Sequence, residues 1–150
     1  MYHTLVRRNV RQSFDHLNQA DYASVVRQFA PNIEHWFAGN HALSGRRCHA
    51  ATAQQWYARL FRLFPGIHFE VKEIFVSGTP WHTRVVVRFD VHLKTPAGEP
   101  YENQVAQFIG IRWGRITSIE LHEDTQKLVG LLKQIAEAGN AEAMAKPIEG

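Results

Sequence analysis

The chain has 150 residues, 45% of them hydrophobic and 21% charged, which is typical of one soluble globular domain. Its net charge is +3, and the basic residues form no stripe with interleaved aromatics, so nucleic-acid binding is not expected. There is no run of about 18 apolar residues to predict a membrane-spanning helix. Cys48 is the only cysteine, which excludes an intramolecular disulfide and fits a reducing, cytoplasmic location.

The first half of the chain is predicted to be mainly helical. Apolar residues at helical spacing predict a helix over 4–17, and Asp21 is a good N-cap for a second, short helix. Alternation in "NIEHWFA" then predicts a short strand. After a loop with two glycines, an apolar stripe predicts a third helix over 49–64, which Pro65 and Gly66 end.

After Gly66 the hydrophobic period changes from that of a helix to that of a strand. Alternation predicts four strands and then a last helix, over 67–78, 82–93, 101–113, 115–124 and 125–138. Helices followed by antiparallel strands predict an α+β domain over 1–138, with helices on one face of a strongly curved sheet. Such a cone leaves a pocket, and the small polar residues of 139–150 predict a flexible tail.

Three segments together resemble one family: "FAPNIEHWFAGNHALSGRRCHAATAQQWYARLFRLFPGIHFEV", "AGEPYENQ" and "WGRITSIELHEDT". Their order resembles the NTF2-like superfamily, which has a cystatin-like fold, and within it the SnoaL-like polyketide cyclases and limonene epoxide hydrolases. The likeness extends from Leu5 to Leu132. It implies a cone-shaped α+β fold, but the superfamily includes enzymes, carriers and proteins without activity, so the residues must indicate the function.

The hairpin at Trp113-Gly114 predicts which residues face the cone. Pairing Arg112 with Arg115 predicts that Phe108 lies opposite Ile119 on the face that lines the cone, although a slip of one residue would exchange the two faces. The aromatic residues beside and within the third helix are interpreted as a ligand wall, with core packing as the alternative. The candidate ligand-binding residues are therefore Trp36, Trp56, Tyr57, Phe108, Ile119 and Leu121.

Three residues are candidates for proton transfer. The resemblance implies a catalytic acid at the position of Leu121, where this chain has none, and a substrate-polarising pair at Arg88 and Asp90. Alternation places Arg88 and Asp90 opposite the core face of their strand, so a surface ion pair is the alternative. In the loop "HWFAGNHALSGRR", His41 is the candidate for contact with a polar group of a ligand, with a solvated loop histidine as the alternative.

Metals and cofactors are not expected. The nine histidines show no HxH or HExxH spacing and have no cysteine partner at a fixed distance. Nucleotide-binding glycine motifs are absent. Glu120 and His122 point the same way on the last strand, either as a proton-transfer pair or as part of an outer sheet face.

Two functions remain open from the sequence. The first is a cofactor-free, SnoaL-like pocket protein that binds a small hydrophobic, polyketide-like or ring-like molecule and transfers protons within the cone. The second is a non-catalytic binding or scaffold protein. In either case the resemblance implies a homodimer that buries the outer face of the sheet.

Overall fold

Four α-helices, a short 3-10 helix and six strands make up the computed structural model, which describes residues 1–150. In chain order they are α1 (Tyr2–Asn18), α2 (Tyr22–Val26), β1 (Phe29–Phe37), β2 (Gly45–Arg47), α3 (Ala50–Leu63), β3 (His68–Thr79), β4 (His82–Lys94), β5 (Pro100–Arg112), β6 (Arg115–Glu123), α4 (Thr125–Glu137) and η1 (Ala141–Met144). None of the helices combines the length and the apolar character that crossing a bilayer requires.

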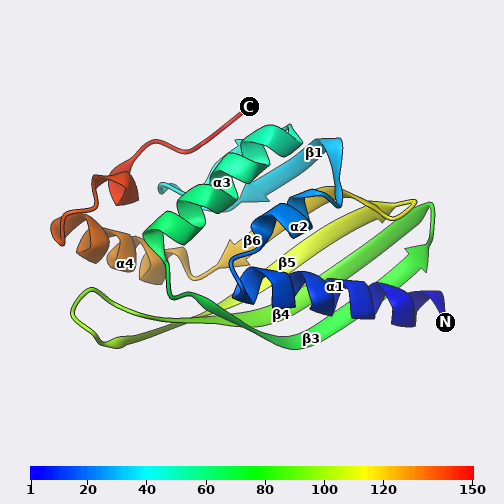
Figure 1. Ribbon diagram of the computed structural model, residues 1–150, viewed down its shortest axis with the longest axis horizontal. Coiled ribbons are helices and arrows are strands. Elements are labelled where there is room, and N and C mark those ends of the chain that lie inside the picture. Colours follow the sequence, from blue (N-terminus) through cyan, green and yellow to red (C-terminus); the bar gives the residue numbers. More distant parts are fainter.

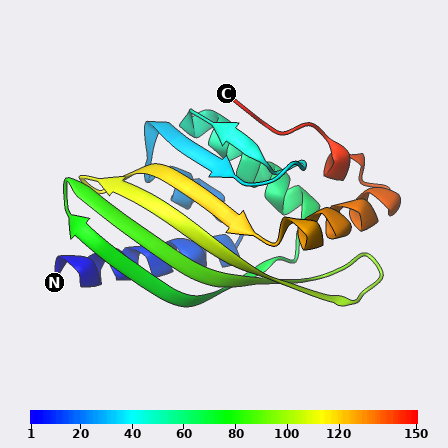
Figure 2. The same cartoon turned by 180° about the vertical axis from the view of Figure 1, so that it is seen from behind.

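The six strands form one curved sheet in the order β2-β1-β6-β5-β4-β3. Strands β3 to β6 form the predicted antiparallel meander, while β1 runs parallel to β6 and β2 is added at the edge. Helices α1, α2 and α3 cover one face of the sheet (Figure 1), and the opposite face carries no helix (Figure 2). This arrangement confirms the predicted α+β cone. The sequence did not predict β2, because three residues are too few to show alternation.

The core lies between the helices and the concave face of the sheet. Helix α1 turns its apolar stripe toward β3 and β4, where the ring of Phe14 lies 4.8 Å from that of Phe89. The period of the stripe is that of an α-helix, so every third or fourth residue is buried. The buried positions of α1 are Val6, Val10, Phe14 and Leu17.

Two irregularities of the sheet bear on the predictions. The register of β3 against β4 shifts between Val71 and Glu73. In the β5–β6 hairpin, Arg112 pairs with Arg115 as predicted. Both residues of the turn have positive φ, 49° at Trp113 and 78° at Gly114. Two central residues with positive φ are the mark of a type I′ hairpin.

The predicted facing of β5 is wrong. Phe108 pairs with Glu120, not with Ile119, and its side chain is 44% exposed on the outer face. Gln107 and Ile109 face the helices instead. The cause is a register shift between β5 and β6: Ile111 pairs with Ile116, but Gly110 pairs with Ser118. This shift of one residue exchanges the predicted inner and outer faces of β5 beyond the turn.

The last residues of the chain lie against α3. Within 139–150, Glu142 of η1 accepts a hydrogen bond from Arg59 at 3.1 Å and from Arg62 at 2.7 Å. The composition of the tail, which predicted flexibility, does not indicate these contacts, because both partners are about 80 positions away.

Candidate functional site

A partly open cavity lies between α1, α3 and the concave face of the sheet. Its volume is about 150 Å³, and 12 of its 17 lining residues are hydrophobic. Of the candidate ligand-binding residues, Tyr57 and Ile119 line it, and Trp56 and Leu121 do not. The helical contribution comes mainly from the buried stripe of α1, and the sheet contributes Gln107, Ile109, Ile111, Ile116 and Ile119.

Two buried polar groups face this cavity. The Tyr57 hydroxyl and the Gln107 amide both belong to lining residues, and neither forms a hydrogen bond with another residue. Burial raises the pKa of Tyr57, so its hydroxyl stays protonated at neutral pH. The cavity therefore offers one hydroxyl and one amide to a ligand in otherwise apolar surroundings, and it contains no group that titrates near neutral pH.

His35 lies next to Tyr57 and is fully buried. Its ring stands 4.5 Å from that of Trp56 and 5.5 Å from that of Tyr57. Nδ1 accepts a hydrogen bond from Arg47 Nε at 3.1 Å, so the proton of the neutral ring is on Nε2, which has no partner. Burial and the Arg47 charge hold the pKa of His35 well below its usual value, which keeps the ring neutral.

The loop that contains His41 is part of the packed interior and does not act as an open lid. Leu43 is fully buried, and its carbonyl accepts a hydrogen bond from Trp56 Nε1 at 2.7 Å. His41 uses both ring nitrogens within the loop, donating from Nε2 to Ala38 O at 2.9 Å and accepting at Nδ1 from the Leu43 amide at 3.2 Å. His41 therefore stabilises the loop and has no ring nitrogen left for a ligand.

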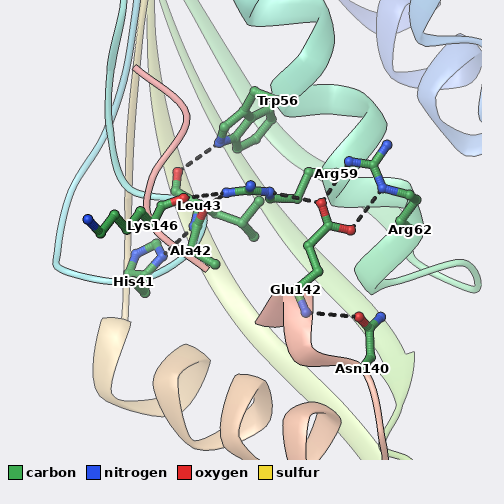
Figure 3. Close-up of polar contacts among 9 residues, drawn as sticks. All are labelled: His41, Ala42, Leu43, Trp56, Arg59, Arg62, Asn140, Glu142 and Lys146. Atoms are coloured by element: carbon green, nitrogen blue, oxygen red, sulfur yellow. Dashed lines mark hydrogen bonds and ion pairs between the residues drawn. The ribbon is translucent and has the colours of Figure 1, made fainter. Parts of the chain in front are cut away.

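Arg59 of α3 connects this loop to the C-terminal residues. Its guanidinium donates to Ala42 O at 2.9 Å and to Lys146 O at 2.8 Å, and it also pairs with Glu142 (Figure 3). Arg62, one turn further along α3, holds the other side of the same carboxylate. The loop, α3 and the C-terminal segment thus form one connected polar cluster at this end of the cone.

Arg88 and Asp90 lie on the outer face of β4, away from the cavity. Arg88 is exposed and pairs with Glu73 at 2.9 Å. Asp90 is buried beside Glu70 and His92, and the ligand atoms of these three lie within 4.8 Å of one another, a spacing that a metal ion could use. The ammonium of Lys72 lies 3.1 Å from Glu70 and 3.8 Å from Asp90. It therefore already supplies a positive charge to these carboxylates.

Trp36 also lies on the outer face, next to Phe108. The ring of His122 contacts both, at 5.1 Å from Trp36 and 5.7 Å from Phe108. His122 also lies 3.4 Å from Glu120, so the predicted acid-imidazole pair exists, but on the surface of the sheet. Neither Trp36 nor Phe108 reaches the cone, and their predicted role as ligand wall is wrong for this cavity.

A second, smaller pocket lies toward the other end of the cone. Trp56 and Leu121 line it, and its volume is about 50 Å³. Its only ionisable residues are Tyr101 and Glu123, and Glu123 was not among the candidates. The alternation of β6 did indicate it, because Glu123 continues the inward series of Ile119 and Leu121.

The sequence matches the family model of the SnoaL-like domain over residues 10–119. The chain belongs to the SnoaL-like family. A comparison with curated protein sequences finds no significant match.

Solved structures show the same SnoaL-like fold. TerC, crystallized with polyporic acid, is 19% identical with a TM-score of 0.71, over 83% of this chain and 95% of that one. An NTF2-like protein from Burkholderia pseudomallei is 19% identical with a TM-score of 0.73, over 83% and 95%. Wild-type IdmH from Streptomyces antibioticus is 16% identical with a TM-score of 0.69, over 87% and 97%. At these identities the likeness concerns the fold, and not the function.

Proposed function

We propose that this SnoaL-like protein binds a small, ring-shaped hydrophobic molecule in the cavity between α1, α3 and the sheet. The observation that carries the proposal is the apolar cavity of about 150 Å³ with two unpaired polar groups. An apolar protein cavity of about 150 Å³ is large enough to hold a benzene ring. The cavity therefore suits a single ring with one or two polar substituents.

The polar groups set the orientation of the ligand. Gln107 can donate and accept hydrogen bonds, and Tyr57 can do the same through its hydroxyl. Hydroxyl or carbonyl substituents on the ring could pair with these groups, which an unsubstituted ring cannot do. TerC, which shares the fold, was crystallized with polyporic acid, and this supports a small-molecule ligand for the present chain.

Phenol is a probe of suitable size and polarity. We expect phenol to bind, and replacing Val10 by phenylalanine to weaken binding by about tenfold or more, since the added ring fills the cavity. Isothermal titration calorimetry measures the affinity. Val129→Phe on α4, which does not line the cavity, is the matched control and keeps the wild-type affinity.

Gln107→Leu separates the polar contact from the apolar one. This variant should lose affinity for phenol and keep affinity for toluene, because only the hydrogen bond is removed. Urea denaturation confirms that the variants are folded. The proposal is contradicted if the wild type, Val10→Phe and Gln107→Leu bind phenol with the same affinity.

We also propose that a second copy of the chain covers the outer sheet face. Phe75 is 55% exposed and Phe108 44% exposed on this face, beside the half-buried Trp36, and exposed apolar side chains that lie together are typical of interfaces. Sedimentation velocity should show a dimer for the wild type and a monomer for Phe108→Lys. Trp81→Lys, at the end of the β3–β4 hairpin, should remain a dimer. A monomeric wild type would contradict this proposal.

A further inference from the structure

Two carboxylates lie directly opposite each other on the outer face of the sheet. Glu70 of β3 pairs with Asp90 of β4 in the strand register. Like charges at directly opposite positions of neighbouring strands repel each other. Asp90 is only 8% exposed, and its carboxylate accepts no hydrogen bond from another residue. Because a buried carboxylate is unfavourable without a donor or a cation beside it, this pair favours a cation between the two strands.

The cation that the chain itself supplies balances only part of this charge. Lys72 is the one lysine or arginine within ion-pair distance of either carboxylate, 3.1 Å from Glu70 and 3.8 Å from Asp90. One ammonium and two carboxylates leave one negative charge uncompensated. The Lys72 side chain is 46% exposed, and an exposed ion pair contributes little to stability, so its ammonium can turn into solvent. A divalent ion in its place would balance both carboxylates.

His92 adds a nitrogen ligand to the two carboxylates. It lies two residues beyond Asp90 on the same face of β4, and its Nε2 is 3.2 Å from Glu70 Oε1. Two ligands of a tetrahedral zinc ion, each about 2.0–2.1 Å from the metal, are roughly 3.3 Å apart. The His92–Glu70 distance already has this value. Because the three ligand atoms lie within 4.8 Å of one another, no distance among them has to shorten by more than about 1.5 Å.

We propose that Glu70, Asp90 and His92 bind a divalent transition-metal ion of the zinc type on the outer face of the sheet. Zinc accepts carboxylate oxygen and imidazole nitrogen together, whereas Ca²⁺ and Mg²⁺ take oxygen ligands. The His92 ring binds the ion through Nε2 and keeps its proton on Nδ1. Three protein ligands leave a fourth position for water or for an anionic ligand. The spacing of histidines along the sequence does not indicate this site, because the pairing of β3 with β4 brings Glu70 beside Asp90.

The proposed metal site is separate from the 150 Å³ cavity. None of its three residues lines that cavity, so the inference goes beyond the proposed binding function and does not depend on it. The site is also distant from the exposed aromatic residues of the outer face. Val86, which pairs with Phe108, is four residues from Asp90 along β4, roughly 13 Å at the rise of a β-strand. No helix covers this face of the sheet (Figure 2), so an ion can reach the site from solvent.

Isothermal titration calorimetry with zinc chloride tests the proposal on the full chain. We expect one zinc ion per chain. Asp90→Asn and His92→Gln should each lower the affinity by about a hundredfold, because loss of an outer-shell partner alone commonly costs 10–100-fold. Glu73→Gln and His82→Asn are the matched controls and should keep the wild-type affinity. Both control residues are exposed, on the same two strands, and lie outside the cluster.

Lys72→Met tests whether the ammonium occupies the position of the ion. Its removal should raise the zinc affinity by about tenfold, because the ion then has no internal competitor. Zinc should also raise the melting temperature of the wild type and of the two control variants, and leave that of Asp90→Asn unchanged, since only a bound ligand stabilises the folded state.

Three results would overturn the proposal. The first is a wild type that binds no zinc by calorimetry and shows no rise in melting temperature. The second is zinc binding by folded Asp90→Asn and His92→Gln that is as tight as that of the controls, which would place the ion at other histidines. The third is weaker binding by Lys72→Met, which would show that the ammonium does not compete with the ion. Urea denaturation confirms that each variant is folded.

Discussion

Replacing Arg47 by methionine is expected to lower the free energy of unfolding by about 3–4 kcal/mol, because its buried partners lose their donors together. The Arg47 side chain is fully buried. It donates to Ser44 O at 3.0 Å, Ile148 O at 2.7 Å, Gly45 O at 2.9 Å and His35 Nδ1 at 3.1 Å. Methionine fills a similar volume but donates to none of these acceptors, of which His35 Nδ1 and Ser44 O are buried.

Urea denaturation measures this change, and the adjacent residue is a matched control. Arg46 is half-exposed, and its side chain pairs only with Glu34, at 3.4 Å. Arg46→Met should change the stability by no more than about 0.5 kcal/mol. Equal stability of the two variants would mean that the buried hydrogen bonds of Arg47 contribute no net stability.

Replacing Glu123 by glutamine is expected to stabilise the protein at high pH and to have little effect at low pH. The carboxyl has a pKa near 4.5 in the unfolded chain, which burial raises to about 8 in the folded protein. Between these values the folded state holds a proton that the unfolded state releases, so the stability of the wild type falls as the pH rises through this window. Glutamine does not titrate, so the variant avoids this loss.

The expected difference between variant and wild type is near zero at about pH 4 and about 4–5 kcal/mol in favour of the variant at about pH 9. Urea denaturation across this pH range measures it. Glu120→Gln, on the exposed face of the same strand, should show a difference from the wild type that does not vary with pH. A pH-independent difference for Glu123→Gln would show that its carboxyl is solvated in the folded protein.

The sequence alone determined the elements and their order, except for the short strand β2 and the 3-10 helix η1. The apolar period of 3.6 in α1, α3 and α4, and of two in β3 to β6, comes directly from burial of one face, so it is visible without any tertiary information. The turn at Trp113 and Gly114 and the N-cap at Asp21 are also local, because their conformations depend on residues within a few positions. The α+β cone follows from these local features and the order in which they occur.

Only the tertiary structure decided which side chains meet. One register shift at Gly110 placed Gln107 inside and Phe108 outside, and no local pattern predicts it, because both faces of β5 carry apolar residues. The partners of Arg47 and Arg59 lie up to 101 positions away in the C-terminal segment. The burial that raises the pKa of Glu123 comes from helices and strands throughout the chain. Such contacts depend on how distant segments pack, and a sequence pattern reports only on neighbours.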